Sequence, residues 1–514
     1  MKKKQRLAVI DIGSLKTVMK IFSISADAPP EEIESIRSYL PLGTYTYRNG
    51  VISSEDIQAV SDILLRFLET IRAYKVQKVL CVATSAFREA ENKFFAVEQI
   101  RLRTGFSIEI LDNSMERFYR NLLVKETTED FLKLIADGTF MLDIGAGSIQ
   151  SSVFNSESFI FSQNMLLGPL RISDLYAGFS HSVSEPQVVL EEYISRVLED
   201  YHAIAPKDVQ YKTLIAFGEE TAYLKLLLDM DPQSTVSLST EKFFTFFQRL
   251  EKISVSSLIL DYHIPSPAAG LIQPSALLIK KTLEYGRFTK ILLPEISLPD
   301  GLSFYYANKY QHFPLQFDYR EDILTAARNI GKRYRYDKKH AERVRVFSAE
   351  IFSSLLRLHG LSEKEKLLLE TAAILYEVGK HIHISDYLLR SYRIIDTTEI
   401  VGLSEKELSV VSNTIRYCAS TSVFRAHSFQ ELPEDVMSIV SKLSAILSLA
   451  DALEVSRKQK IVRLKVNAAQ GSFSFLCDCQ SDASYEVWEF DKRKTLFLEV
   501  FGVAPELKIR RVSK

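Results

Sequence analysis

The chain has few of the residues that mark secreted or membrane-bound proteins. Four cysteines occur in 514 residues, and their number and scatter exclude a disulfide framework: Cys81, Cys418, Cys477 and Cys479. No apolar run reaches the length of a membrane span. The run that follows the basic start MKKKQR breaks at Asp11, too early for a signal peptide. We therefore expect a cytoplasmic protein with no membrane partner.

An excess of charge of one sign is also lacking. The 64 Lys and Arg residues are balanced by 65 Asp and Glu residues, which gives a net charge of -1. A balanced chain has no overall attraction to nucleic acid, although a local basic cleft can exist within it. We expect no nucleic-acid partner. A chain of 514 residues exceeds what one hydrophobic core usually supports, which indicates several domains.

What the chain does contain is one short motif in two copies. Leu7–Ser14 reads LAVIDIGS and Phe140–Ser148 reads FMLDIGAGS. In each copy an apolar run typical of a buried strand ends on Asp and passes into a glycine turn, where the backbone can approach a ligand closely. Asp beside Gly and Ser suits a hydrated divalent cation with phosphate better than a bare anion. One copy is common turn chemistry, but the pair predicts two lobes that face one cleft.

Apolar periodicity indicates how the rest of the chain is organised. It predicts a helix over residues 54–74 and strand–turn–helix units at 76–92 and 213–228. The polar, proline-bearing passage 296–314 is a candidate hinge. From about residue 320 to 455 the pattern is almost wholly helical, with helices predicted at 341–358, 363–375, 405–417 and 433–453. The tail alternates through VRLKVNAAQGSFSFLCDC and TLFLEVFG, which predicts a small β-rich unit.

These motifs together resemble the exopolyphosphatase and guanosine pentaphosphate phosphohydrolase (Ppx/GppA) family of the actin-like ATPase superfamily. The resemblance spans nearly the whole chain, with VIDIGS at 9–14, ATSAFREAEN at 83–92, ILDNSMER at 110–117, LDIGAGSIQ at 142–150, LGPLRISD at 167–174, HAERV at 340–344 and LYEVG at 375–379. It implies a two-lobed α/β actin-like (ribonuclease H-like) core, then an all-α HD-like domain and a small β-rich C-terminal unit. The implied bounds are 1–130 for lobe I, 131–312 for lobe II, 313–458 for the helical domain and 459–514 for the C-terminal unit.

The resemblance also implies an activity. It is the release of terminal phosphate from inorganic polyphosphate, or from guanosine pentaphosphate, by metal-assisted attack of water in the cleft between the lobes. Mg²⁺ or a similar divalent cation would be held by Asp11 and Asp143, where it neutralises developing charge. Glu116 aligns with the family's glutamate that orients the attacking water. The implied phosphate-binding residues are Ser14, Lys16, Arg88, Gly145, Ala146, Gly147 and Ser148.

Other readings of these residues stay open. Glu116 can be an ordinary solvated glutamate at a helix start, and Arg88 can form a surface salt bridge instead of a bidentate contact with phosphate. Lys16 stands where the family usually has a small polar residue, so it either supplies a point charge to the substrate or stabilises an altered loop.

Further departures from the family pattern support an alternative function. Arg117 replaces the Ala that usually follows the catalytic glutamate, and Gln150 replaces a glutamate that helps to hold metal and water. Gln150 can orient water but cannot act as an anionic ligand. Glu219 and Glu220 would repel a polyanion unless they bind a cation or point away. The alternative is a catalytically weakened regulatory protein that binds polyphosphate or an alarmone; a sugar or acetate kinase ranks last, since no clear adenosine-site motif is present.

The helical domain keeps little of the metal site that an HD fold requires. His340 is retained, but Tyr376 and Glu377 stand where the His-Asp pair would be. We therefore expect no metal there and a packing role for His340. The domain is expected to extend a substrate groove or to form the interface of a homodimer. The basic stretch 328–339 (RNIGKRYRYDKK) either guides a long polyanion or is a solvated helix face.

Overall fold

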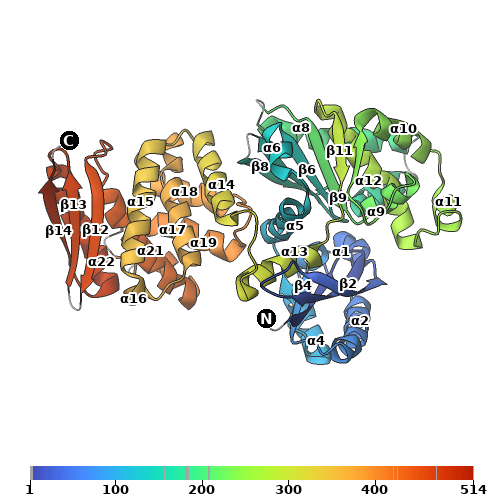
Figure 1. The fold of residues 1–514 in the computed structure, drawn as a ribbon, viewed down its shortest axis with the longest axis horizontal. Coiled ribbons are helices and arrows are strands. Elements are labelled where there is room, and N and C mark those ends of the chain that lie inside the picture. The colour runs from blue at the N-terminus through green and yellow to red at the C-terminus, as the bar shows by residue number, and fades with distance from the viewer. Residues whose placement is uncertain are drawn as a thin grey trace. The chain divides into compact units, whose positions relative to one another are not determined.

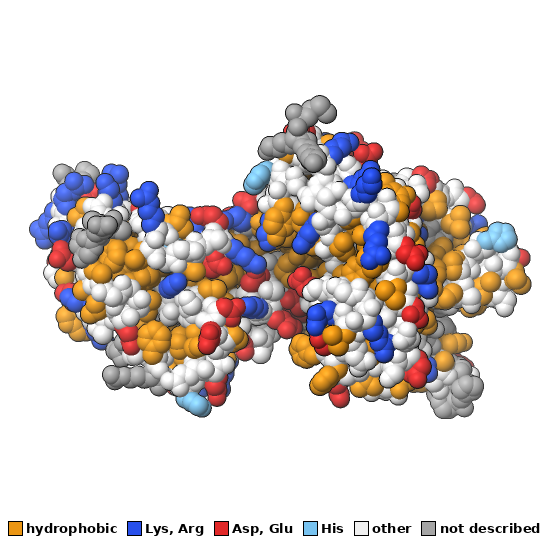
Figure 2. All heavy atoms as spheres, turned by 90° about the horizontal axis from the view of Figure 1, so that it is seen from below, with side chains coloured by type: hydrophobic (Ala, Val, Ile, Leu, Met, Phe, Trp, Pro, Cys, Tyr) orange, Lys and Arg blue, Asp and Glu red, His pale blue; other side chains and the backbone are white. Residues whose placement is uncertain are grey.

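The computed structural model describes residues 4–155, 158–179, 184–206, 209–420, 422–424, 426–469 and 472–512. The chain divides after Tyr319 into two compact units (Figure 1). Unit 1 contains two sheets with their helices, and unit 2 contains a helical domain followed by a three-stranded sheet. Within the described ranges, every helix is too short or too polar to span a lipid bilayer. Basic and acidic side chains are interspersed over the face shown in Figure 2, as the balanced composition predicts.

The first sheet of unit 1 and its helices form lobe I. The strand order is β3-β2-β1-β4-β5, with β1 (Gln5–Ile12), β2 (Lys16–Ile24), β3 (Glu31–Tyr39), β4 (Lys78–Ala83) and β5 (Glu109–Ile110). The helices are α1 (Leu42–Asn49), α2 (Ser54–Ala73), α3 (Ser85–Glu89) and α4 (Lys93–Thr104). Helix α2 confirms the helix predicted at 54–74, and Ser53 caps it by accepting a hydrogen bond from the Asp56 N–H at 3.0 Å.

The second sheet and its helices form lobe II, which repeats the topology of lobe I. Its strand order is β10-β11-β9-β6-β7-β8, with β6 (Thr139–Ile144), β7 (Ile149–Asn155), β8 (Ser158–Met165), β9 (Thr213–Gly218), β10 (Val236–Ser239) and β11 (Lys290–Leu293). In each lobe the first strand pairs antiparallel with the second and parallel with the fourth. The duplication predicted from the twin motifs is therefore confirmed. The helices of lobe II are α6 (Phe131–Ala136), α7 (Pro169–Phe179), α8 (Pro186–Ile204), α9 (Thr221–Leu227), α10 (Thr240–Leu250), α11 (Val255–Leu260) and α12 (Ser266–Tyr285).

Two helices join the lobes and pack against each other. Helix α5 (Asn113–Thr127) leads from lobe I to lobe II, and α13 (Leu298–Tyr306) returns from lobe II to β1 and β2. A Cβ on Gly301 would lie only 2.2 Å from the Tyr119 carbonyl oxygen, so this approach of the two helices requires glycine. The passage 296–314 was predicted as a hinge, but much of it is helical. The side chain of Ser297 caps α13, and the Lys20 ammonium holds the α13 residue Asp300 at 2.8 Å.

Unit 2 confirms the helices predicted at 363–375, 405–417 and 433–453. Its helices are α14 (Tyr319–Arg333), α15 (Lys338–Ser354), α16 (Leu356–His359), α17 (Glu363–Leu375), α18 (Tyr387–Asp396), α19 (Glu405–Tyr417), α20 (His427–Gln430) and α21 (Glu434–Ala452). The helix predicted at 341–358 is divided between α15 and α16. Within the basic stretch 328–339, Arg328 forms ion pairs with Glu321 at 2.5 Å and Glu342 at 2.6 Å, so part of this charge is neutralised locally.

The last part of unit 2 is a sheet covered by one helix. Its strands β12 (Ile461–Ala469), β13 (Ser472–Cys479) and β14 (Pro505–Arg511) follow the order β12-β13-β14, and α22 (Ser484–Phe501) connects the parallel pair β13 and β14. The prediction that TLFLEVFG is extended is wrong. This segment forms the end of α22, where Leu496 and Phe497 are buried and Gly502 ends the helix with a φ of 72°. Short alternation cannot separate a strand from a helix end.

Candidate functional site

The two glycine turns of the repeated motif have the same geometry. At the end of β1 the Gly13 N–H donates to the Lys16 carbonyl oxygen (2.9 Å), and at the end of β6 the Gly145 N–H donates to the Ser148 carbonyl oxygen (3.0 Å). A Cβ on Gly13 or Gly145 would lie 3.0 or 3.1 Å from that same oxygen. A larger residue would therefore press on the backbone of either turn, and each turn leaves an aspartate at or next to the end of its strand.

A single cavity of about 240 Å³ lies between the two turns. It is lined by lobe I, helix α5 and lobe II. The predicted site residues that line it are Asp11, Ser14, Lys16, Glu116, Asp143, Gly145, Ala146, Ser148 and Gln150. Arg88 and Gly147 are not among the lining residues. Arg88 instead bonds Glu116, and Gly147 adjoins Tyr47, which bonds Ser14.

The two aspartates are buried and only partly bonded. Asp11 is 7% exposed and Asp143 is 3% exposed. Burial raises the pKa of Asp11 to about 7 and that of Asp143 to about 6, and the charge of Arg120 only partly offsets this effect. Asp11 Oδ1 and Asp143 Oδ2 have no hydrogen-bond partner among the described residues. Two buried carboxylates with an unbonded oxygen each could serve as two of the oxygen ligands of a divalent cation.

Glu116 is a buried member of an arginine cluster and not a solvated residue. It lies in the first turn of α5, whose N-terminus is capped by Asp112 through the Met115 N–H at 2.8 Å. Arg88 donates to Glu116 Oε2 at 3.0 Å and also to the Leu111 carbonyl oxygen at 2.8 Å. Burial alone would raise the pKa of Glu116, but Arg120 and Arg88 together lower it. The glutamate is therefore held ionised and in a fixed position.

Arg120 is a site residue that the sequence did not predict. Its Nη1 donates to Asp143 Oδ1 at 2.7 Å, and its Nη2 lies 3.2 Å from Glu116 Oε1. It therefore links the predicted base to one of the predicted metal ligands. The spacing of four residues from Glu116 to Arg120 was a usable signal, because residues four apart lie on one face of a helix.

Arg117 and Gln150, two departures from the family pattern, are hydrogen-bonded to each other. Arg117, on α5, is fully buried, and its Nε donates to Gln150 Oε1 at 3.0 Å while Nη1 donates to Ser162 Oγ at 2.7 Å. The two departures from the family pattern therefore form one contact between α5 and the sheet of lobe II. In this contact the Gln150 carbonyl accepts from Arg117, and the side chain still lines the cavity.

Three hydroxyl groups meet beside the first turn. Ser14 Oγ lies 2.7 Å from both the Tyr47 hydroxyl and Ser85 Oγ, and the Tyr47 hydroxyl donates to Ser85 Oγ at 3.0 Å. A Cβ on Gly147 would lie 2.0 Å from the Tyr47 hydroxyl oxygen. Tyr47 therefore fixes Ser14 of the first motif against Gly147 of the second, a role that no sequence pattern indicated.

Two sets of contacts tie the lobes together. In the first, Arg171 of the LGPLRISD motif forms an ion pair with Glu89, donates to the Gly147 carbonyl oxygen at 2.7 Å and lies over the Tyr47 ring at 3.9 Å. Close by, Arg48 Nη2 lies 2.6 Å from Asp174 Oδ1.

The second set of contacts joins β2 and β3 to the region of β9 and α9. Lys16 Nζ lies 3.1 Å from Glu219 Oε2, and the hydroxyls of Tyr39 and Tyr223 lie 2.9 Å apart. Lys16 therefore has an acidic partner within the cleft. Glu220 next to it is 2% exposed, and burial together with the charge of Glu219 raises its pKa to about 8.

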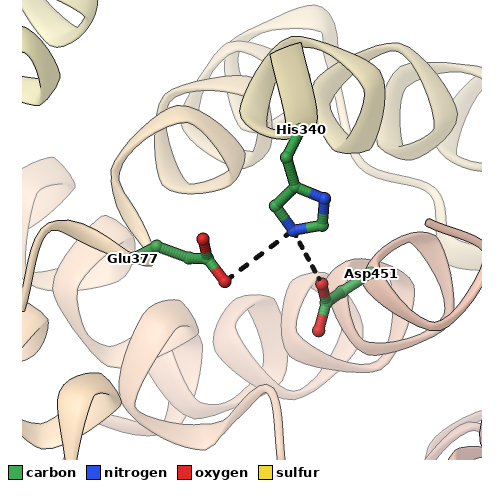
Figure 3. Close-up of side chains that lie close together, drawn as sticks. All are labelled: His340, Glu377 and Asp451. Carbon is green, nitrogen blue, oxygen red and sulfur yellow. Dashed lines mark ion pairs between the residues drawn. The ribbon is translucent and has the colours of Figure 1, made fainter. Parts of the chain in front are cut away.

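Unit 2 contains a second cluster of potential ligands. Among the described residues, one group of three His, Cys, Asp or Glu side chains has ligand atoms within 4.8 Å of one another: His340, Glu377 and Asp451 (Figure 3). The His340 Nε2 lies 3.3 Å from Asp451 Oδ1 and 3.7 Å from Glu377 Oε1. Asp451 was missed at the sequence level, because it lies far along the chain on α21.

Every carboxylate oxygen of this cluster already has a partner. The Tyr376 hydroxyl lies 2.5 Å from His340 Nε2 and donates to Asp451 Oδ1 at 2.6 Å, while Arg493 donates to Asp451 Oδ2 at 2.5 Å. Arg457 donates to both oxygens of Glu377, at 2.5 and 2.7 Å. Burial would raise the pKa of Asp451, but its contacts with His340 and Arg493 lower it. The cluster is a charge-balanced network that joins α15, α21 and α22.

Two family models and several curated proteins match this sequence. A sequence model of the Ppx/GppA phosphatase family matches residues 20–302, and one of domain III of Ppx/GppA phosphatases matches residues 324–483. The guanosine-5'-triphosphate,3'-diphosphate pyrophosphatase of Photobacterium profundum is 21% identical over 420 residues, or 80% of this chain and 79% of that protein. Exopolyphosphatase 1 of Mycobacterium tuberculosis is 24% identical over 168 residues, or 33% of this chain and 48% of that protein.

Solved structures of the same family share the fold. The Ppx/GppA family member of Aquifex aeolicus has a TM-score of 0.51 and 20% identity and covers 60% of this chain and 100% of its own. An exopolyphosphatase from Cytophaga hutchinsonii has a TM-score of 0.51 and 19% identity and covers 60% of this chain and 99% of its own. With the two-lobed actin-like core, the repeated acidic turns and a family match over more than half of its length, this chain belongs to the Ppx/GppA phosphatase family.

Proposed function

We propose that the chain hydrolyses the terminal phosphoanhydride bond of inorganic polyphosphate or of guanosine pentaphosphate in the cavity between lobes I and II. The observation that carries this proposal is that Asp11, Glu116 and Asp143 line one cavity together with both glycine turns. A terminal phosphoryl group would lie against the backbone of these turns, where N–H groups can stabilise negative charge that develops on its oxygens.

Each carboxylate has a separate role in this proposal. Glu116 accepts a hydrogen bond from the attacking water and orients it towards phosphorus. Its lowered pKa makes it a positioning acceptor more than a strong base at neutral pH. Asp11 and Asp143 would hold Mg²⁺, and their unbonded buried oxygens fit that ion. When bound, Mg²⁺ supplies positive charge beside the phosphoryl oxygens.

A second candidate function is a binding protein for the same polyanions with little or no turnover. It is favoured by the arginines on α5, since Arg117 engages Gln150 and Arg120 engages both Glu116 and Asp143. Arginine forks bind phosphate well, whereas the carboxylates they engage are less available to metal and water. The two candidates share the cavity and differ in the fate of the bound phosphate.

Phosphate release with Mg²⁺ from long-chain polyphosphate and from guanosine pentaphosphate distinguishes the two. The parent is compared with Glu116→Gln, which keeps the shape of the side chain but removes its charge. Glu129→Gln, at an exposed position of the same unit, is the matched control. We expect the parent and the control to release phosphate at the same rate, and Glu116→Gln to be slower by about a hundredfold or more.

The other outcomes are equally informative. Turnover that Glu116→Gln leaves unchanged would remove the assigned role of Glu116. Tight binding of both substrates by the parent, without any release, would establish the second candidate. If the parent neither binds nor hydrolyses either compound, the cavity is not a phosphate site and both candidates fail.

For the helical domain, we propose an HD-like fold whose former metal position is filled by protein groups. The paired state of both carboxylates supports this proposal, because the Tyr376 hydroxyl and the Arg457 and Arg493 guanidinium groups supply the partners that a metal would otherwise provide. Thermal unfolding followed by the fluorescence of Trp488, which lies in unit 2, tests it. We expect the same midpoint with EDTA and with excess Mn²⁺; a midpoint raised by Mn²⁺ alone would identify a metal site.

A further inference from the structure

The guanidinium group of Arg120 lies close to the three carboxylates that line the cavity, those of Asp11, Glu116 and Asp143. The Arg120 side chain is only 13% exposed and lines the cavity, and its guanidinium bonds Asp143 Oδ1 and Glu116 Oε1 through different nitrogens. Asp11 is close enough for the Arg120 charge to lower its pKa against the effect of burial. Burial alone would lower the pKa of Arg120, but the charges of Asp143 and Glu116 raise it by more. Arg120 therefore stays charged.

This arrangement differs from that of a ready metal site. Within the described part of the chain, only the His340 group brings three ligand atoms within 4.8 Å, so Asp11, Glu116 and Asp143 do not. Mg²⁺ binds oxygen at about 2.0–2.1 Å and needs the carboxylates to converge. With Arg120 between them, two of the required oxygens are occupied, and a divalent ion would also be repelled by the guanidinium.

We propose that Arg120 is an internal competitor of the divalent cation, and that the cation gains its full affinity only when the guanidinium leaves Asp143. Asp11 Oδ1 and Asp143 Oδ2 remain as the oxygens through which the ion first binds. Once released, the Arg120 fork lies within the cavity and is free to bind oxygens of the substrate phosphate. The inference deepens the proposed function and takes from it the identity of the cation ligands.

Titration of the full-length protein with Mn²⁺ in the absence of substrate tests this, with calorimetry or the electron spin resonance of free Mn²⁺ as the readout. The variant is Arg120→Met, which removes the guanidinium and its charge and keeps an unbranched apolar side chain. Arg117→Met is the comparison variant: it removes the same charge three residues earlier on α5 from a residue that bonds Gln150 and Ser162 and acts on Glu116 and Asp143 through its charge.

We expect Arg120→Met to bind Mn²⁺ roughly tenfold or more tightly than the parent, and Arg117→Met to gain clearly less, because only Arg120 occupies a carboxylate oxygen of Asp143. An unchanged or weaker affinity in Arg120→Met overturns the inference. An equal gain in both variants also overturns it, because net charge alone would then explain the effect. If the circular dichroism of Arg120→Met shows a misfolded protein, Arg120→Gln replaces it with the same expectations.

This outcome is independent of turnover. A gain specific to Arg120→Met in a protein that releases no phosphate would leave the inference standing and remove the hydrolase. Turnover in the parent, without a gain in Mn²⁺ affinity in Arg120→Met, would overturn the inference and leave the hydrolase standing.

Discussion

Replacing Glu220 by glutamine should stabilise unit 1, and the gain should grow with pH. Glu220 is 2% exposed, and its Oε2 lacks a hydrogen-bond partner in the part of the chain that the structure describes. Burial and the neighbouring Glu219 raise its pKa from 4.5 to about 8. The folded chain therefore holds this proton up to about pH 8, whereas the unfolded chain releases it near pH 4.5. The folded state binds more protons between these values, so its stability falls as pH rises through the window.

The separation of the two pKa values sets the size of the effect. A difference of one in pKa corresponds to about 1.4 kcal/mol. The ionisation of Glu220 then costs the folded state about 1 kcal/mol at pH 5, about 3 kcal/mol at pH 7 and about 5 kcal/mol at pH 9. The glutamine side chain of the variant is neutral at every pH, so Glu220→Gln should exceed the parent in unfolding free energy by these amounts.

Urea unfolding at the three pH values measures the difference. Far-UV circular dichroism follows both units, and the fluorescence of Trp488, the sole tryptophan, identifies the transition of unit 2. That transition should be the same in the parent and the variant. Glu129→Gln controls for loss of an exposed carboxylate in unit 1. A gain of equal size at pH 5 and pH 9, or a loss at pH 9, would refute the assigned ionisation.

Three other substitutions test contacts of the fold, and a fourth, Gly178→Ala, is the control for Gly147→Ala. Gly147→Ala places a Cβ 2.0 Å from the Tyr47 hydroxyl oxygen, so we expect unit 1 to lose roughly 1–3 kcal/mol and pyrophosphate binding to weaken by calorimetry. Gly178→Ala, on an exposed helix face with open space, should instead be neutral or stabilise by up to about 1 kcal/mol. Tyr376→Phe removes the hydroxyl that links the histidine and the aspartate of the unit 2 cluster and should cost about 1–3 kcal/mol in the Trp488 transition. Lys20→Met leaves Glu32 and Asp300 without the ammonium group that both of them contact. It should lower the unfolding free energy of unit 1 by roughly 3 kcal/mol.

The parts of the site that the sequence could predict are those fixed by local geometry. A strand that ends on Asp and turns through Gly has few alternative conformations, so the positions of Asp11 and Asp143 followed from the two motifs. Arg88 was predicted to bind phosphate or to form a salt bridge, but a motif does not specify which group a long side chain reaches; it lies in α3 and bonds Glu116. Arg120 could be placed on the same helix face as Glu116, yet only the packing of α5 directs that face into the cavity.

Contacts between distant segments could not be predicted from the sequence either, because they depend on how helices pack. Asp451 meets His340 because α21 packs against α15, and no spacing rule connects them. The misread end of α22 shows the converse problem, since a short apolar pattern fits either a strand or a helix until its neighbours are known. Tyr47 adds a third case, since an aromatic hydroxyl on a short helix carries no signal of its own.

The two sets of contacts between lobes I and II each contain an ion pair, Arg171–Glu89 in one and Lys16–Glu219 in the other. A separation of the lobes that loads or releases a polyanion would break the Arg171–Glu89 and Lys16–Glu219 ion pairs. Because these contacts are mostly ionic, added salt should hasten their rupture. The bound polyanion would then dissociate faster in added salt, and its affinity for the cavity would fall. The residence time of the polyanion should therefore be the property that depends most strongly on ionic strength.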